Sequence, residues 1–241
     1  MEFNLLTFAS SKYDKTLKRI NNEAHNMKIF NDIFAWNEHD IDVDFFNKHS
    51  DFMKNSNRGF GYWIWKPQII LQALKKIPRG SILIYCDAGC SLNVEGVSRL
   101  REYGNMVINH PAHILCFQQS DSIECSWTKM DLMNYLNYNK PEEMTTKQMV
   151  GGIIVIHNVD DIEKFFKNWL DICCADNYRY IDNSESKTPN SQSFCDHRHD
   201  QSIFSILCKQ NKCLIIPDET YWENAWDRYK HYPIHATRLK Y

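Results

Sequence analysis

The chain has 241 residues, which suits one α/β domain that buries a core without disulfides or a structural metal. Apolar residues make up 43% and charged residues 24%, so wholesale disorder is excluded. The net charge of −2 argues against a protein that binds nucleic acid through bulk positive charge.

Two features of the sequence bear on its compartment. The first residues have neither the basic stretch nor the long apolar stretch of a signal peptide, and no run approaches the roughly 18 apolar residues that span a bilayer. The nine cysteines are odd in number and scattered, and no second pair follows Cys86 and Cys90, which favours reduced thiols over disulfides or a zinc site. We therefore expect a soluble cytoplasmic protein.

Apolar patterns predict alternating strands and helices along most of the chain. In chain order we expect a strand at 3–9, a helix at 17–27, a strand at 33–36, helices at 42–53 and 67–77, a strand at 81–86, a helix at 94–103, a strand at 114–118, a helix at 129–138, a strand at 150–156, a helix at 160–174, a polar loop at 176–199, a helix at 201–209 and a strand at 213–216. This alternation predicts a single α/β domain over residues 1–241, with a mostly parallel sheet and helices on both faces.

The strand at 81–86 is continuously apolar, as in a strand buried on both faces of a parallel sheet, and it ends in Asp87, Ala88 and Gly89. Ligands of open α/β sheets bind beyond the carboxyl ends of the strands, where a carboxylate can hold a divalent cation. A turn or helix-capping role explains a lone aspartate equally well.

An unusual cluster of glycine, aromatic and cationic residues covers 57–67, just before a helix that Pro67 opens. Arg58 and Lys66 flank rigid aromatic surface that includes Trp63, which would suit a diphosphate beside a flat or sugar-like group. Gly59 and Gly61 would let the backbone approach that ligand. The alternative is a Trp-rich corner of the core with the two cations at the surface.

Four segments together resemble a group of GT-A-type glycosyltransferases found among bacterial surface-polysaccharide and large-DNA-virus proteins. They read GFGYWIWKPQIILQAL, ILIYCDAGC, MVGGIIVI and HRHDQSIFSIL, and the pairing of WxWKP with DAGC is the most specific part. The resemblance implies a GT-A-like, Rossmann-like fold that binds a nucleotide-sugar at the carboxyl edge of its sheet. It places the donor-binding half at about 1–120 and the acceptor and catalytic half at about 121–241.

The resemblance also implies roles for residues on the donor side of the site. Thr7 and Ala9 would meet the base and ribose, and Ala88 and Gly89 would line the donor beside Asp87. In the wider class this turn reads Asp-x-Asp and a divalent metal, Mn²⁺ or Mg²⁺, binds the diphosphate; Gly89 stands at the second Asp position, which leaves Asp87 as the carboxylate ligand from this turn.

On the acceptor side, the resemblance places Gly151 and Gly152 against the sugar and acceptor, together with His199. A strand bulge would explain the two glycines as well. Asp200 and Gln201 are similar to an Asp-Gln pair that such enzymes hold against the donor sugar, and a carboxylate there can stabilise an oxocarbenium-like transition state or accept the acceptor's proton. Asp200 can instead be a simple helix cap.

The tail at 218–241 is aromatic and basic. By resemblance, His235 would complete the metal site and Arg238 would lie over the diphosphate, where its charge can also replace that of a metal. A solvated basic tail is the alternative. Two other functions compete with sugar transfer to a glycan or hydroxyl acceptor: a sugar nucleotidyltransferase on a related fold, disfavoured because no Gly-rich loop follows the first strand, and a non-catalytic carbohydrate-binding protein.

Overall fold

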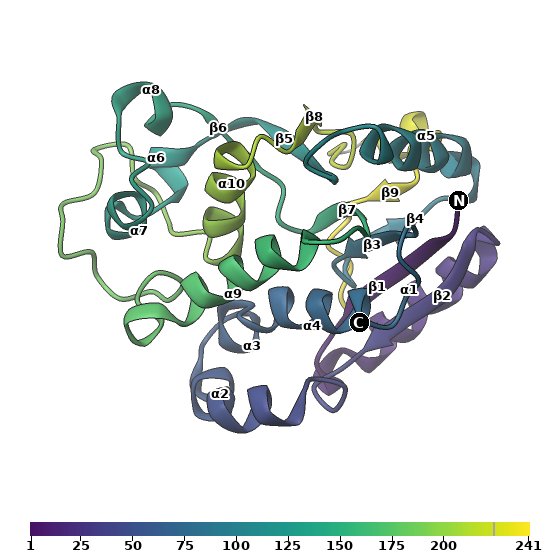
Figure 1. Cartoon of the computed structure of the whole chain (residues 1–241), viewed down its shortest axis with the longest axis horizontal. Helices are drawn as coiled ribbons and strands as arrows, with labels where there is room; N and C mark the ends of the chain where they lie inside the picture. Colours follow the sequence, from purple (N-terminus) through teal and green to yellow (C-terminus); the bar gives the residue numbers. More distant parts are fainter. Residues whose placement is uncertain (224) are drawn as a thin grey trace.

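A computed structural model describes residues 1–223 and 225–241 of the chain. The elements of the first half are β1 (Phe3–Phe8), α1 (Asp14–Met27), β2 (Phe30–Trp36), α2 (Val43–Asn55), α3 (Gly59–Tyr62), α4 (Trp65–Leu74), β3 (Ile82–Cys86), β4 (Ser91–Leu92) and α5 (Val97–Ile108). Those of the second half are β5 (Ile114–Ile123), α6 (Glu124–Trp127), α7 (Met130–Tyr135), α8 (Pro141–Met144), β6 (Lys147–Met149), β7 (Ile153–His157), α9 (Ile162–Tyr178), α10 (Asp200–Gln210), β8 (Leu214–Pro217) and β9 (Ile234–His235). They form one body around a central sheet (Figure 1).

The central sheet has seven strands in the order β2-β1-β3-β7-β5-β6, and β8 also pairs with β5. β1, β2, β3, β5 and β8 run in one direction, because β1 pairs parallel with β2 and β3, and β5 pairs parallel with β8. β7 is antiparallel to both β3 and β5, and β6 is antiparallel to β5. The prediction of a mostly parallel α/β sheet is therefore confirmed, with two strands that run the other way.

The strand expected at 150–156 begins later, as β7 at Ile153, and it runs antiparallel to both of its neighbours. Residues 147–157 run antiparallel along β5, but the run is broken between β6 and β7: Met149 is opposite Gln118, while Val155 is opposite Leu115. The extra residues bulge out of the ladder at Gly151-Gly152. Beyond this bulge the chain enters the sheet between β5 and β3, which carries the two glycines to the carboxyl end of β3.

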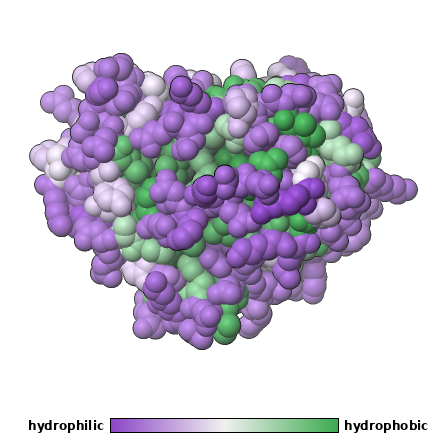
Figure 2. Space-filling model, viewed as in Figure 1, coloured by the Kyte–Doolittle hydropathy of each residue, from purple (hydrophilic) through white to green (hydrophobic). Residues whose placement is uncertain are grey.

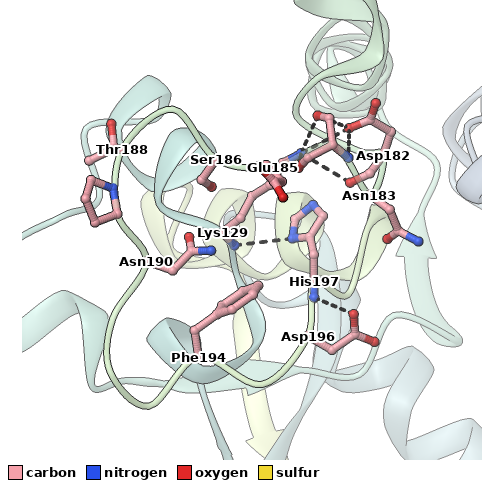
Figure 3. A pocket seen from close by; sticks show the side chains of 12 residues that line it. Lys129, Asp182, Asn183, Glu185, Ser186, Thr188, Asn190, Phe194, Asp196 and His197 are labelled. Carbon is pink, nitrogen blue, oxygen red and sulfur yellow. Dashed lines mark hydrogen bonds and ion pairs between the residues drawn. The ribbon is translucent and has the colours of Figure 1, made fainter.

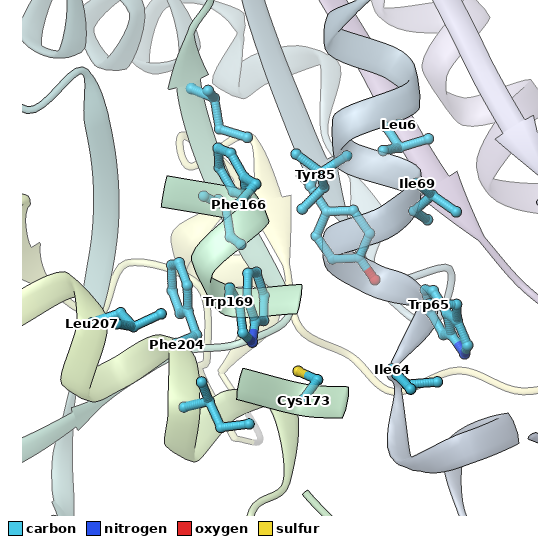
Figure 4. Packing of buried hydrophobic residues seen from close by; sticks show 14 of the residues in the cluster. Leu6, Ile64, Trp65, Ile69, Tyr85, Phe166, Trp169, Cys173, Phe204 and Leu207 are labelled. Atoms are coloured by element: carbon cyan, nitrogen blue, oxygen red, sulfur yellow. The ribbon is translucent and has the colours of Figure 1, made fainter. Parts of the chain in front are cut away.

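Two apolar layers cover the two faces of the sheet. α1 and α5 pack on one face against the side chains of Leu5, Ile84 and Val155. α4, α9 and α10 pack on the other face against the alternate residues of the same strands, among them Tyr85. Figure 4 shows Tyr85 between α4 and α9, with Trp169 of α9 beside Phe204 of α10; the rings of this pair lie 4.9 Å apart. Burial of each such aromatic side chain contributes about 1.5–3 kcal/mol to the free energy of unfolding.

Other local features follow the sequence closely. All nine cysteines are free thiols, as expected. The expected helix at 129–138 forms as the shorter α7, and the polar stretch after it contains α8 and β6. Hydrophilic residues cover most of the face in Figure 2, with hydrophobic residues visible mainly between them. None of the described helices combines the length and apolar character needed to cross a bilayer.

Candidate active site

Three charged side chains from distant parts of the sequence meet at the carboxyl end of β3. Asp87 directly follows β3, Lys66 lies in the first turn of α4, and Asp200 is the first residue of α10. The Lys66 ammonium lies 2.5 Å from Asp200 Oδ2 and 3.6 Å from Asp87 Oδ1, and it donates a hydrogen bond of 3.0 Å to the carbonyl oxygen of Gly151. The Tyr85 hydroxyl donates to Asp87 Oδ1 over 2.6 Å. The expected donor and catalytic residues therefore form one ionic cluster.

Burial sets the proton affinities in this cluster. Burial raises the pKa of Asp200 to about 6, although the Lys66 ammonium opposes that change. Burial also acts to lower the pKa of Lys66, but the charges of Asp200 and Asp87 outweigh it and raise the pKa overall. The pKa of Tyr85 rises because it is buried and faces Asp87, so Tyr85 remains a hydrogen-bond donor at neutral pH. The side chain of Asp87 is 43% exposed and that of Asp200 only 5%, so Asp87 is the carboxylate open to a ligand.

The two glycines of the bulge let this cluster close together. A Cβ atom on Gly152 would lie 2.7 Å from Asp87 Oδ2, and one on Gly151 would lie 2.8 Å from Gln201 Cβ. The Asp87 N–H donates to the Gly152 carbonyl over 2.8 Å, and the Gly151 N–H donates to Gln201 Oε1 over 3.2 Å. A side chain at either glycine would push one of the site carboxylates or amides aside.

Helix α1 holds the turn at 87–90 in place. The Arg19 guanidinium donates to the carbonyl oxygens of Ala88 and Cys90, each over 2.7 Å, and pairs with Glu23 at 2.6 Å. In the sequence Arg19 and Glu23 read as an ordinary i,i+4 pair on the polar face of a helix, so this role was missed. Their spacing alone carries no signal for a contact with a turn about 70 residues later.

The C-terminal tail lies directly on the same turn. The carbonyl oxygen of Gly89 accepts hydrogen bonds from the Leu239 N–H, at 2.9 Å, and from the Thr237 hydroxyl, at 3.1 Å. A Cβ on Gly89 would lie 3.4 Å from the Arg238 Cα. Arg238 itself is exposed, and its guanidinium lies 5.3 Å from the centre of the Tyr221 ring. The tail therefore contacts this turn mainly through its backbone at residues 237–239.

Residues 59–63 form a left-handed turn before α4. All five have positive φ, from 51° at Phe60 and Tyr62 to 87° at Gly61. Each non-glycine residue in such a conformation costs roughly 1–2 kcal/mol. Gly59 lies under the Trp63 ring, where a Cβ would approach to 2.4 Å, so this glycine serves the turn itself. Strain of this kind is typical of functional sites.

This turn presents aromatic rings to His199. The centre of the His199 ring lies 4.7 Å from that of Tyr62 and 5.7 Å from that of Trp63. His199 Nδ1 donates to the Ile181 carbonyl over 2.7 Å, while Nε2 is buried and has no partner among the described residues. Burial lowers the pKa of His199 to about 4. A neutral imidazole with a free Nε2 lone pair is an acceptor for a hydroxyl group.

The remaining expected donor residues are Arg58 and, at the end of β1, Thr7 and Ala9. Arg58 pairs with Asp196 at 2.9 Å, and both side chains are exposed, so this cation already has a partner, and it lies near His199. Thr7 and Ala9 lie at the carboxyl end of β1, which is parallel to β3, so they share an edge of the sheet with Asp87. Thr7 Oγ1 is buried without a partner among the described residues, so both the donor and the acceptor capacity of its hydroxyl are unused.

The two expected metal ligands differ in exposure: His235 is buried, whereas the Asp87 carboxylate is partly exposed. His235 lies in β9, its Nε2 is 2.9 Å from the Tyr229 carbonyl, and its ring packs on Trp226. Among residues 1–223 and 225–241, no three His, Cys, Asp or Glu side chains cluster as a metal site. Asp87 alone offers an exposed carboxylate, so any divalent cation here would take its remaining ligands from water and from the substrate.

A buried polar network behind the site was also missed in the sequence. Gln201 Nε2 donates to Gln148 Oε1 over 2.8 Å, and Gln148 Nε2 donates to Glu124 Oε2 over 3.1 Å. Glu124 is fully buried and pairs with Lys209 at 2.6 Å. The network fixes the side-chain amide of Gln201, because each of its partners is itself held in place.

The fold is an α/β sheet with helices on both faces, and the Lys66–Asp87–Asp200 cluster lies at the carboxyl end of β3, where ligands of such sheets bind. No protein-family model matches the chain, and no curated protein matches it in sequence. Among solved structures, the chain resembles a glycosyltransferase involved in the glycosylation of the major capsid of PBCV-1, with a TM-score of 0.52, 12% identity, and 98% of this chain and 93% of that one covered. This likeness establishes a shared fold.

Two further structures are similar at a lower level. Mouse xyloside xylosyltransferase 1 gives a TM-score of 0.49 at 10% identity, with 98% of this chain and 97% of that one covered. The galactosyltransferase LgtC, solved with donor and acceptor sugar analogs, gives 0.48 at 9% identity, with 96% of this chain and 86% of that one covered.

Proposed function

We propose that this protein is a glycosyltransferase that moves a sugar from a nucleotide-diphosphate sugar to a hydroxyl group of a glycan or another acceptor. The observation that carries the proposal is the Lys66 ammonium held between Asp87 and Asp200 at the carboxyl edge of the sheet. The fold shared with the PBCV-1 glycosyltransferase supports it. Thr7 at the carboxyl end of β1 shares this edge of the sheet with Asp87, as the proposed donor position requires.

In this proposal the donor lies across the turn at 87–89, with its base and ribose near Thr7 and Ala9. Asp87 faces the ribose or the diphosphate, because its carboxylate is the exposed one. Lys66 is 2% exposed, so it acts on the donor through the two carboxylates that it pairs with. Trp63, Arg58 and Arg238 border the site and supply aromatic surface and positive charge for the sugar and the leaving group.

In the reaction, the acceptor oxygen bonds to the anomeric carbon of the donor as the bond from that carbon to the diphosphate breaks. The acceptor proton passes to the carboxylate of Asp200 if the configuration inverts. If the configuration is retained, Asp200 orients the sugar and stabilises the cationic transition state, and the acceptor proton passes to the departing diphosphate oxygen. Gln201, Gly151, Gly152 and His199 line the space for the sugar and acceptor, and the nucleoside diphosphate leaves.

Mn²⁺ or Mg²⁺ is the proposed cofactor, with Asp87 as its protein ligand. When bound, the cation would supply Lewis-acid stabilisation to the departing diphosphate. In His235, the contact of Nε2 with the Tyr229 carbonyl leaves Nδ1 as the nitrogen that would bind the cation. The nearby guanidinium of Arg238 is the protein's own source of positive charge for the same leaving group.

Thermal-shift measurements with UDP, GDP, CDP, dTDP and ADP, each with and without Mn²⁺, test the proposal. We expect at least one nucleoside diphosphate to raise the melting temperature, and Asp87→Ala to abolish that rise. Asp160→Ala is the matched control, since its side chain is 97% exposed beside Arg79, away from the site. If none of the five stabilises the protein, the proposed function is wrong.

A further inference from the structure

A polar cavity lies outside the Lys66–Asp87–Asp200 cluster, under the loop that follows α9. Its volume is about 380 Å³, within the usual range of small-ligand sites. Figure 3 shows Lys129 and His197 in its centre, with the loop from Asp182 to Asp196 passing around them. No role at the proposed donor site uses this cavity.

The loop has no regular secondary structure between residues 183 and 199, yet it is firmly attached. The Asp131 carboxylate accepts the backbone N–H groups of Lys187, at 2.9 Å, and Thr188, at 3.0 Å, and it also accepts Arg179 Nε at 2.8 Å. Asn190 Oδ1 accepts the Met130 N–H at 2.8 Å. The cavity walls are therefore formed in advance, which lowers the entropy cost of binding a ligand.

The charges at the centre of the cavity are already paired. Lys129 is 2% exposed, and its ammonium lies 3.0 Å from Asp182 Oδ1 and 3.3 Å from Ser184 Oγ. The His197 ring uses both nitrogens, at 3.3 Å from the Lys129 N–H and 3.0 Å from the Tyr180 carbonyl. With these groups satisfied, the described lining holds no unpaired cation for an anionic ligand.

What the lining offers instead is neutral polar groups and one aromatic ring. Asn183 is exposed, Ser186 Oγ is buried with no partner among the described residues, and Phe194 lies along one wall. Amides and hydroxyls that surround an aromatic ring match a ligand with many hydroxyls and an apolar face. The carboxylate of Glu185 beside them disfavours a polyanion.

A second cavity of about 290 Å³ adjoins the first. It shares Asp182, Asn183 and Ser184 with the first cavity, and Tyr62 forms part of its lining. The Tyr62 ring packs on His199, the residue before Asp200. The two cavities adjoin along residues 182–184 as one groove, and the Tyr62 ring separates this groove from His199.

We propose that this groove, formed by the loop at 182–197 and by Tyr62, binds a neutral oligosaccharide as the acceptor. The inference rests on the proposed glycosyltransferase function and names its acceptor class. The oligosaccharide lies along the groove with one sugar ring against Phe194, and its other end lies at Tyr62.

Saturation-transfer NMR with defined oligosaccharides tests this inference. The probes are neutral di- to tetrasaccharides of glucose, galactose, mannose, xylose and N-acetylglucosamine, and matched oligosaccharides of uronic acids, each with the nucleoside diphosphate that gives the largest thermal shift. We expect neutral probes to bind, and Phe194→Ala or Asn183→Ala to weaken binding by roughly three- to tenfold, the loss of one polar or stacking contact.

Asn22→Ala, an exposed asparagine of α1 on the other face of the sheet, is the matched control and leaves binding unchanged. Ser186→Ala repeats the test with a change of one atom if a larger change unfolds the loop. No binding of any neutral probe, equal binding by the groove variants, or preference for the uronic acids overturns the inference. These outcomes are distinct from failure of the proposed function, which appears as no thermal shift with any nucleoside diphosphate.

Discussion

Two buried lysines organise two different regions of this molecule. Lys66 and Lys129 are each only 2% exposed, but Lys66 lies between two carboxylates, whereas Lys129 has one carboxylate and otherwise backbone and hydroxyl oxygens. The carboxylates raise the pKa of Lys66, while burial lowers that of Lys129. The first lysine is part of a charged cluster open to a ligand at Asp87, and the second attaches a loop.

The largest expected effect comes from removing each lysine. Lys66→Met leaves Asp87 and Asp200 facing each other without a counter-charge, and we expect it to lower the free energy of unfolding by about 3–5 kcal/mol. Lys129→Met leaves a carboxylate that reaches solvent, so we expect a smaller loss. Urea unfolding of both variants measures the two losses, and equal losses would contradict the comparison.

Asp200 should matter more to catalysis than to donor binding. We expect Asp200→Asn to lower the transfer rate by roughly 10²–10⁴-fold, as for loss of a positioned base. Binding of a nucleoside diphosphate should persist, since the amide keeps the shape of the carboxylate. Steady-state rates and a thermal shift on the same preparation separate the two effects. A variant with the full transfer rate would remove Asp200 from the reaction.

A substitution at Gly152 tests whether the ionic cluster requires the backbone of Gly152 to lie close to the Asp87 carboxylate. A Cβ at this position lies 2.7 Å from Asp87 Oδ2, so Gly152→Ala should displace Asp87 and weaken nucleoside diphosphate binding by about tenfold, the equivalent of 1.4 kcal/mol. Gly80→Ala is the control: its φ is +86° and no atom lies within 4 Å of its Cβ, so it introduces backbone strain without a new contact. Calorimetric titration should show weakened binding in the first variant alone.

The smallest expected effect is on the pH dependence. Because the pKa of Asp200 is about 6, a reaction that uses its carboxylate as base should speed up as the pH rises through 6. For stability the sign is opposite. The folded-state pKa exceeds the unfolded value, so the stabilisation from this group is present below about pH 4 and is lost as the pH rises past 6. Both trends should disappear in Asp200→Asn; if they persist, another group titrates.

The sequence predicted the parts of the site that local patterns encode. The buried run that ends in Asp87 placed that carboxylate at the edge of the sheet, and the helix after His199 placed Asp200 in its first turn. The partners could not be predicted, because each pair is distant in the sequence. Lys66 was predicted to face a diphosphate, and only packing of α4 against the sheet turns it inward between two carboxylates.

Other misses have the same physical origin. A short apolar run looks the same in a parallel and an antiparallel strand, so the direction of β7 depended on which neighbours it found. The left-handed turn at 59–63 was visible only as two glycines, since Phe60, Tyr62 and Trp63 rarely adopt positive φ. The Glu124–Gln148–Gln201 network consists of polar residues on separate elements, none of them unusual alone.

The ion cluster has a consequence for how a donor would enter. One ammonium opposite two carboxylates leaves one negative charge, and a nucleoside diphosphate brings more. Association must therefore draw in positive charge, as a proton on Asp200, a divalent ion at Asp87 or a guanidinium that moves in from the tail. The affinity for the donor would then depend on the concentration of counter-ions in solution as strongly as on the fit of the sugar.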